Sequence, residues 1–310
     1  MEMVKSHWVK MVWAIPLMLA ALTAPAVAED RVTLGWGRLF TNDALGDAKD
    51  RWRTGAYTVS RVRGYRWSGD LPTQPGELLE FRGHAETIAP IHLDKPAKSD
   101  RRYAALLSLG MHSHFGWKGN EVSLGADLVF SGPQTGISRF QGFIHGMLGL
   151  PKPQVTDNQI GNAVYPTLVA ELGRSIAMGD NASFRPFVEA QAGLETFVRV
   201  GGDLVIGRLG QDDLILRQSS TGQRYRAVEG ARDQSLSFVL GGDIAQVFDS
   251  HLLPQGEDAT LSDSRSRLRA GVHWQGKKAS AFYGVSYLGP EFDEQPQGQV
   301  VGALNLNLKF

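Results

Sequence analysis

The chain ends in the stretch ALNLNLKF (residues 303–310), in which apolar and polar side chains alternate up to the last residue. Successive side chains of a β-strand point to opposite faces, so this pattern predicts a strand with one apolar and one polar face. A final aromatic residue on such a strand is typical of bacterial outer-membrane β-barrels. The alternative is a terminal Phe310 that ends a soluble β-sheet by chance.

The same two-residue period recurs upstream and predicts further strands of roughly 8–12 residues. The clearest examples are residues 103–111, 122–130, 184–194 and 268–274. Strands of a soluble β-sandwich are usually shorter, and here the face opposite the apolar row carries Gly, Ser, charged and amide residues throughout. This suits a barrel with a lipid-facing outside and a polar lumen. Aromatic residues near strand ends are candidates for interfacial girdles: Trp117, Phe130, Tyr165, Trp274 and Tyr287.

The N-terminus has the three parts of a secretory signal. Lys5 and Lys10 give a basic region, residues 11–24 are mostly apolar, and residues 26–28 (AVA) form a small-residue cleavage site. The apolar part is shorter than the roughly 20 residues of a spanning helix, which disfavours a membrane anchor. We therefore expect residues 1–28 to be removed and residues 29–310 to form one outer-membrane barrel domain.

Composition excludes several classes of protein. The chain has 32 basic and 32 acidic residues, so nothing favours a nucleic-acid partner, and it has no cysteine for a disulfide scaffold or a thiol nucleophile. No G-x-S-x-G, H-E-x-x-H or C-x-x-C motif occurs. At ~10 residues per membrane strand the length suits about 12 antiparallel strands. Residues 210–234, 249–266 and 289–298 are interpreted as polar connections.

The first candidate site lies in FTNDALGDAKDRWRTGAYT (residues 40–58). Asn42 and Asp43 follow a strand-like segment, and Thr54 lies in the next one. An Asn-Asp pair usually starts a turn. Two adjacent oxygen-bearing side chains at a strand end are also suitable ligands for a hard cation such as Ca²⁺.

The second candidate site lies in SGPQTGISRFQGFIHGMLG (residues 131–149), which breaks the two-residue period. A turn signal is followed by Thr135, a candidate cap for a short helix in an extracellular loop. On that helix Gln141 and His145 are four residues apart and share a face. Histidine is the usual general base near neutral pH, and Gln141 is placed to orient it or a water molecule. The alternative is a histidine that is merely a polar loop residue.

Two further patterns allow more than one interpretation. Arg51 and Arg101 each follow an aspartate at a strand start, where they could bind phosphate, brace carboxylates or form structural ion pairs in a polar lumen. His112 and His114 share a strand face, a spacing that can chelate a metal. No third ligand accompanies this histidine pair.

Four blocks of sequence together resemble the lipid A 3-O-deacylase family of Gram-negative outer membranes. They are residues 42–58, 99–110, 131–149 and 186–202, they occur in family order, and the first and third are the most specific. The resemblance implies a 12-stranded outer-membrane barrel with a calcium-dependent site near its outer rim. It also implies removal of the 3′-acyloxyacyl group from lipid A.

By the same resemblance, His145 activates the attacking water, and Asn42 and Asp43 belong to the Ca²⁺ site. Thr54 matches a threonine needed for activity, and Gln141 matches the helix residue beside the base. The chain departs from the family pattern where Arg53 replaces the usual tyrosine, at Gly193-Leu194, and at residues 156–159. Lys95 and Lys98 are candidates for the substrate-binding basic pair of the family.

The sequence therefore predicts an outer-membrane ester hydrolase that acts on lipopolysaccharide in contact with membrane lipids, and we expect a monomer. The alternative is a non-catalytic barrel with a structural or transport role. A phospholipase with a catalytic serine is a third reading, without a motif to support it. The sequence leaves open which acyl chain is cleaved and whether activity is latent in the native membrane.

Overall fold

The computed structural model of the chain describes residues 30–92, 100–149, 154–230, 234–254 and 259–308. Within this part the barrel belongs to the unit Val32–Phe310. The expected signal peptide, Lys95, Lys98 and the terminal Phe310 lie outside the described residues. No helix in the described part has the length and hydropathy to span a membrane.

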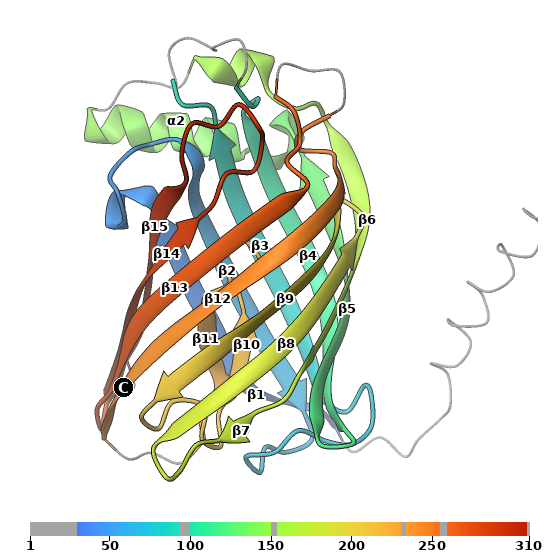
Figure 1. Ribbon diagram of the computed structural model, residues 1–310, viewed down its shortest axis with the longest axis vertical. Coiled ribbons are helices and arrows are strands. Elements are labelled where there is room, and N and C mark those ends of the chain that lie inside the picture. The colour runs from blue at the N-terminus through green and yellow to red at the C-terminus, as the bar shows by residue number, and fades with distance from the viewer. Residues whose placement is uncertain (1–29, 93–99, 150–153, 231–233, 255–258, 309–310) are drawn as a thin grey trace, which may run out of the picture. The chain divides into compact units, whose positions relative to one another are not determined.

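Twelve long antiparallel strands form the barrel wall (Figure 1). They are β1 (Val32–Asn42), β2 (Trp52–Gly64), β3 (Leu79–Ala89), β4 (Ala104–Trp117), β5 (Asn120–Ser131), β6 (Ala163–Gly173), β8 (Ala182–Ala192), β9 (Glu195–Ile206), β12 (Ser235–Ser250), β13 (Ser264–Gln275), β14 (Ala279–Leu288) and β15 (Gln299–Leu308). The prediction of about 12 strands is confirmed. Several strands are longer than expected, up to 16 residues in β12.

Two pairings close the barrel. The first strand pairs with the last, with Phe40 opposite Leu304. Strand β6 pairs with β8, past the two-residue strand β7 (Ile176–Ala177), with Leu168 opposite Ala192. The junction of β1 and β15 is short, with three residue pairs from Phe40–Leu304 to Asn42–Gly302. Together the two pairings close the ring of strands, as expected for a sheet surrounded by lipid.

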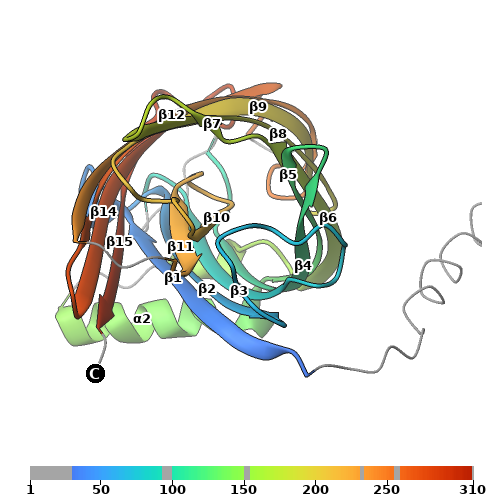
Figure 2. The ribbon, with the colours of Figure 1, turned by 90° about the horizontal axis from the view of Figure 1, so that it is seen from below.

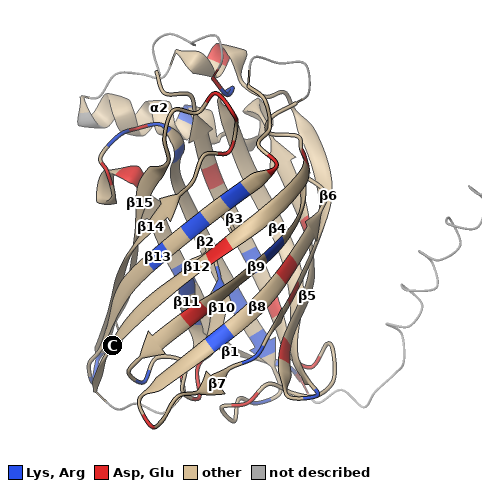
Figure 3. Ribbon diagram, viewed as in Figure 1, with Lys and Arg blue, Asp and Glu red and all other residues tan. Residues whose placement is uncertain are grey.

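The alternation in the sequence separates the two faces of the wall. On the terminal strand β15, Leu306 and Leu308 are 62% and 67% exposed on the outside. Near strand ends, Trp117, Trp274 and Tyr287 are also exposed, as expected for interfacial aromatic residues. The lumen side carries charged residues of both signs along the strands (Figure 3).

A short hairpin lies inside the ring of strands (Figure 2). It consists of β10 (Leu214–Arg217) and β11 (Arg224–Val228), and its apolar residues pack against barrel residues such as Leu39 and Val62. Its polar residues bond to the wall, for example through the hydroxyls of Tyr225 and Ser60, 2.8 Å apart. The interpretation of residues 210–234 as a plain polar connection was therefore wrong, because their few apolar residues are buried within the barrel. A cavity of about 170 Å³ remains in the lumen.

Most of the longer loops gather at the end of the barrel opposite Leu308, the last described residue of β15, together with α2 (Ile137–Leu148) (Figure 1). They also contain the 3₁₀ turns η1 (Asp43–Leu45), η2 (Pro133–Thr135) and η3 (Val155–Asn158). Outer-membrane barrels have short periplasmic turns and long outer loops, so this is the outer rim. Both predicted halves of the site lie here.

Candidate active site at the outer rim

Asn42 is the last residue of β1 and the N-cap of the η1 turn. Its Oδ1 accepts a hydrogen bond from the Ala44 N–H at 2.9 Å, so the local reading as a turn is correct. Its Nδ2 also donates to the backbone oxygen of Thr54 at 2.9 Å. The pairing of Asn42 with Gly55 permits this contact, because a Cβ on Gly55 would lie 2.9 Å from Nδ2. The side chain thus joins the first turn to β2.

Asp43 is buried, with 4% of its surface exposed. Its Oδ2 accepts the Arg51 N–H at 3.3 Å. Burial, followed by the nearby carboxylate of Asp50, raises the pKa of Asp43 to about 8, and the backbone N–H groups of Arg51 and Ala44 only partly oppose this. Among the described residues, no cationic side chain forms an ion pair with this carboxylate. The site therefore has a place for a positive charge.

Thr54 is the extra residue of a β-bulge. Arg53 pairs with Ile88 and Gly55 with Thr87, so the register of β2 and β3 shifts between them. On a regular strand, side chains two residues apart point to the same face of the sheet. A bulge interrupts this alternation and changes the direction in which the side chains beside it point. Arg53 donates to the lumen carboxylate of Glu86, and Thr87, which pairs with Gly55, forms a side-chain hydrogen bond with Tyr103. Bulges are common beside active sites, where they re-aim a side chain.

Helix α2 begins later than the sequence suggested. Its N-cap is Gly136, in the left-handed region at φ 72°, without a side-chain cap. Thr135 ends the η2 turn instead, where its Oγ1 donates to the Gly132 oxygen at 2.9 Å. At the other end Gly149 has φ 70° and donates its N–H to the His145 oxygen. The glycine at residue 136 allows the chain to reverse from turn to helix.

Gln141 and His145 lie on the face of α2 that approaches the barrel. The Tyr103 hydroxyl donates to Gln141 Oε1 at 2.7 Å. Tyr103 is itself buried, in an apolar cluster that includes Ala105 and Ile137. His145 is 8% exposed, and its Nε2 lies 3.7 Å from Oδ2 of Asp50.

Asp50 connects the two halves of the site. It is close to His145 on α2, and its charge raises the pKa of Asp43 in η1. Burial raises the pKa of Asp50 itself, and His145 opposes that rise. In the sequence, Asp50 stands out only as part of an Asp-Arg pair, and no motif assigns a role to Tyr103. Their partners are distant in sequence, so no local pattern identified them.

The donor set suits a hard cation better than a soft one. Asn42 and Asp43 offer amide and carboxylate oxygens, the ligand type that Ca²⁺ prefers. No group of three or more His, Asp or Glu side chains arranged for a metal occurs in the described part of the chain. Further oxygen ligands would have to come from the backbone, water or substrate, as is common for Ca²⁺. The uncompensated Asp43 carboxylate is the feature that fits a cation.

The other sequence candidates are structural. His112 Nε2 lies 3.1 Å from Asp127, and His114 Nε2 lies 2.8 Å from Glu80, so these histidines bond lumen carboxylates. Arg51 pairs with Asp47 at 2.9 Å. Arg101 pairs with Glu291, so both arginines form ion pairs with carboxylates, as the brace and the structural ion-pair interpretations both expect.

The solvent-facing side of α2 is strongly apolar. Phe140, Phe143 and Met147 are 64%, 66% and 67% exposed. Such a face is typical of a helix that lies at a membrane surface. Helix α2 itself lies at the end of the barrel where the outer loops are found (Figures 1 and 2).

Fold and site together define a class: a closed 12-stranded membrane barrel with a His- and Asp-bearing site at its outer rim. The chain belongs to the family described as "Outer membrane protein LpxR", whose model matches residues 14–310. The protein is therefore located in the bacterial outer membrane.

The solved structures support the fold. LpxR from Salmonella typhimurium superposes with a TM-score of 0.74 at 17% sequence identity, covering 89% of this chain and 100% of that one. KdgM porin gives a TM-score of only 0.39 at 7% identity, covering 89% of this chain and 98% of that one. NanC porin gives a TM-score of 0.40 at 6% identity, covering 89% of this chain and 100% of that one. No curated protein matches the sequence.

Proposed function

We propose that this protein hydrolyses the ester that holds the 3′-O-linked acyloxyacyl group of lipid A. The main support is the meeting of His145 from α2, Asp50 from the first outer loop and Asp43 from η1 at the outer rim. Membership of the LpxR family and the rim position are consistent with a substrate in the outer leaflet.

His145 is the general base in this proposal. It takes a proton from a water molecule, whose oxygen attacks the ester carbonyl carbon. The bond to the sugar oxygen then breaks, the proton passes to that oxygen, and the acyl chain leaves as a carboxylic acid. Asp50 faces Nε2 of His145 and favours the imidazolium that forms. Tyr103 fixes Gln141, which orients the base or the water.

Asn42 and Asp43 would hold the divalent cation, for which Ca²⁺ fits the oxygen donor set. When bound, the cation supplies charge stabilisation for the developing oxyanion. Thr54 lies beside this pair, because Asn42 donates to its backbone oxygen. The exposed residues Phe140 and Phe143 on α2 provide an apolar surface for acyl chains next to the reacting ester.

The test is mass spectrometry of lipid A from cells that express the folded barrel in calcium-replete medium. The proposal predicts a lipid A species that lacks the 3′-linked acyl group with the wild type, and none with His145→Ala. Heat-modifiable migration on a gel shows that both barrels are folded. An unchanged lipid A profile with folded wild type contradicts the proposal and favours the alternative of a non-catalytic barrel.

A further inference from the structure

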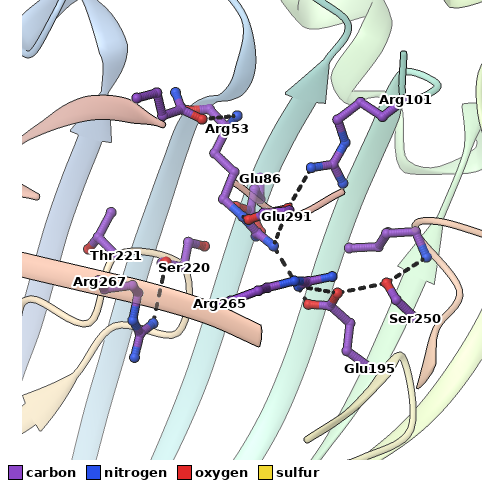
Figure 4. Close-up of polar contacts among 12 residues, drawn as sticks. Arg53, Glu86, Arg101, Glu195, Ser220, Thr221, Ser250, Arg265, Arg267 and Glu291 are labelled. Carbon is purple, nitrogen blue, oxygen red and sulfur yellow. Dashed lines mark hydrogen bonds and ion pairs between the residues drawn. The ribbon is translucent and has the colours of Figure 1, made fainter. Parts of the chain in front are cut away.

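A buried ionic cluster joins several strands and loops of the barrel (Figure 4). It comprises Arg53, Arg101, Arg265, Glu86, Glu195 and Glu291, three residues of each charge. They come from different parts of the barrel, namely β2, β3, β9, β13, the segment before β4 and the loop between β14 and β15. Each of these side chains is nine-tenths or more buried in the chain.

Glu291 is the member that joins two arginines across the barrel top. Both of its carboxylate oxygens bond Arg53, through Nε and through Nη2 at 3.3 Å. Its Oε2 also accepts from Arg101 Nη1 at 2.5 Å. Burial alone would raise the pKa of Glu291, but the surrounding charges of Arg53, Arg101 and Arg265 hold it well below its usual range. The carboxylate therefore stays ionised between its two partners.

The first partner, Arg53, controls the strand end that carries Thr54. The two residues are adjacent at the β-bulge. The chain after Glu291 also contacts this segment: Phe292 packs with Trp52, and Oε1 of Gln299, the first residue of β15, accepts the Arg53 N–H at 2.8 Å. The Glu291 loop thus contacts the segment that carries the bulge through both Glu291 and Phe292.

The second partner, Arg101, lies just before the start of β4. Two residues later, Tyr103 binds Gln141 on α2. Arg101 is 2% exposed and is a fixed point of this segment. Glu291 therefore links, through one carboxylate, the segment that holds Thr54 with the segment that holds the catalytic helix.

Buried ion pairs seldom give a large net stabilisation, because desolvation of the charges offsets their attraction. A cluster placed between the two halves of a site has a different use, namely fixing geometry. A misplacement of about 1 Å can lower a rate by about 100-fold. The three glutamates and three arginines are balanced. Removal of the Glu291 carboxylate leaves a net positive charge and breaks the link between Arg53 and Arg101, while Arg53 keeps Glu86 as a partner at 2.9 Å.

We propose that Glu291 is a positioning residue that holds the Thr54 strand and the α2 segment in register through Arg53 and Arg101. This inference rests on the proposed function for its kinetic consequence, although the positional claim can be measured without activity. Arg53, at the point where the chain departs from the family tyrosine, becomes the residue through which Glu291 acts on Thr54.

The kinetic test compares Glu291→Gln with Glu171→Gln, using lipid A in mixed micelles with calcium. Glu171 is a matched control, because it also bridges two arginines, Arg217 and Arg185, at 2.7 Å each, but away from the rim. We expect Glu291→Gln to lower kcat about 10- to 100-fold with KM nearly unchanged. Glu171→Gln should keep kcat within about threefold, and Glu291→Asp should recover part of the loss. Equal kcat losses in both Gln variants would overturn the proposal.

A second readout does not depend on catalysis. The chain has no cysteine, so Lys49→Cys and Arg139→Cys, on the exposed first loop and on α2, give two unique spin-label sites. The proposal predicts one narrow distance distribution in wild type and Glu171→Gln, and a broadened or shifted one in Glu291→Gln. An unchanged distribution contradicts it.

The kinetic and spin-label measurements distinguish a failure of the proposed function from a failure of the Glu291 proposal. Wild type without deacylase activity refutes the proposed function, and the spin-label distances then decide the role of Glu291 alone. If Glu291→Gln does not fold, Arg101→Gln removes only the link to the α2 side. That variant should loosen the same distance and lower kcat. A distance and rate equal to those of wild type would overturn the proposal.

Discussion

The carboxylates of the lumen and those of the outer rim have opposite surroundings. In the lumen, Glu171 accepts from Arg185 and Arg217 at 2.7 Å each, and Asp203 contacts Arg217 at 2.9 Å. At the rim, Asp43 has backbone N–H partners, and the charges that raise its pKa are those of Asp50 and Asp47.

The difference shows which charges maintain the fold and which are available for function. A buried carboxylate between two guanidinium groups is satisfied, so its removal leaves the arginines without a counter-charge. A buried carboxylate next to a second one is unfavourable until a cation or a proton arrives. The lumen therefore behaves as structure and the rim as a site.

Substitutions at the rim should lower catalytic activity more than substitutions in the lumen. We expect His145→Ala and Asp43→Asn each to lower kcat by about 10²- to 10⁴-fold, because each removes a group that acts at the ester or holds the cation. The lumen variant Glu171→Gln, assayed in parallel on lipid A micelles, should stay within about threefold. A lumen loss as large as the rim loss would end the distinction between the two regions.

Stability should change in opposite directions in the two regions. In calcium-free buffer at pH 8, Glu171→Gln should cost about 3–5 kcal/mol, since two arginines lose their partner. Asp43→Asn should instead stabilise the barrel, by an amount on the order of 2–5 kcal/mol. Equilibrium unfolding in urea from lipid vesicles measures both midpoints. Destabilisation by Asp43→Asn would contradict the account of the rim.

The direction of the stability change follows from the pKa of Asp43, which is about 8 in the folded chain against an ordinary value of 3.8. Between these values the unfolded chain has lost the proton and the folded chain retains it. Stability of the calcium-free wild type should therefore fall as pH rises from about 4 to about 8. Asp43→Asn should lack this part of the pH dependence.

Calcium affinity should depend on pH through Asp43. A proton on Asp43 competes with the cation, so calcium binding should tighten about tenfold per pH unit up to about pH 8 and then level off. Calorimetric titration of the barrel in detergent with Ca²⁺ measures this slope, and Asp43→Asn should bind at least tenfold more weakly. Affinity that does not depend on pH would argue that another group binds the ion.

The smallest expected change in kcat comes from a glycine-to-alanine substitution at the rim. A methyl group at Gly55 would lie 2.9 Å from Asn42 Nδ2, so Gly55→Ala should displace that amide and lower kcat about tenfold. Gly142 on α2 has no atom within 4 Å of an added Cβ, so Gly142→Ala should change kcat by less than about twofold. Initial rates on lipid A micelles compare the two. Equal rates for both alanine variants would show that the position of Asn42 does not matter.

Much of the fold was readable from the sequence because lipid imposes a strict alternation. Residues 303–310 and four similar stretches were enough to predict a barrel of about 12 strands. The inner hairpin was not predictable, because β10 and β11 have only four and five residues and are enclosed by other strands on all sides. Their alternation is too short to distinguish from a loop.

The site was only partly readable. The resemblance assigned Asn42, Asp43, Thr54, Gln141 and His145, and the structure places them at one end of the barrel. The connection between them could not be inferred, since Asp50 and His145 come from two loops that are distant in the sequence and meet only in the folded chain. The role of Glu291 depends on a contact with Arg101 that spans 190 residues.

The most direct test of the rim site is acyl release from purified lipid A by the folded barrel, measured with calcium and with a chelator. The account predicts release of the 3′-linked acyl group by the wild type in calcium, and almost none with chelator or with Asp43→Asn. Equal release with and without calcium, or full activity of Asp43→Asn, would contradict it.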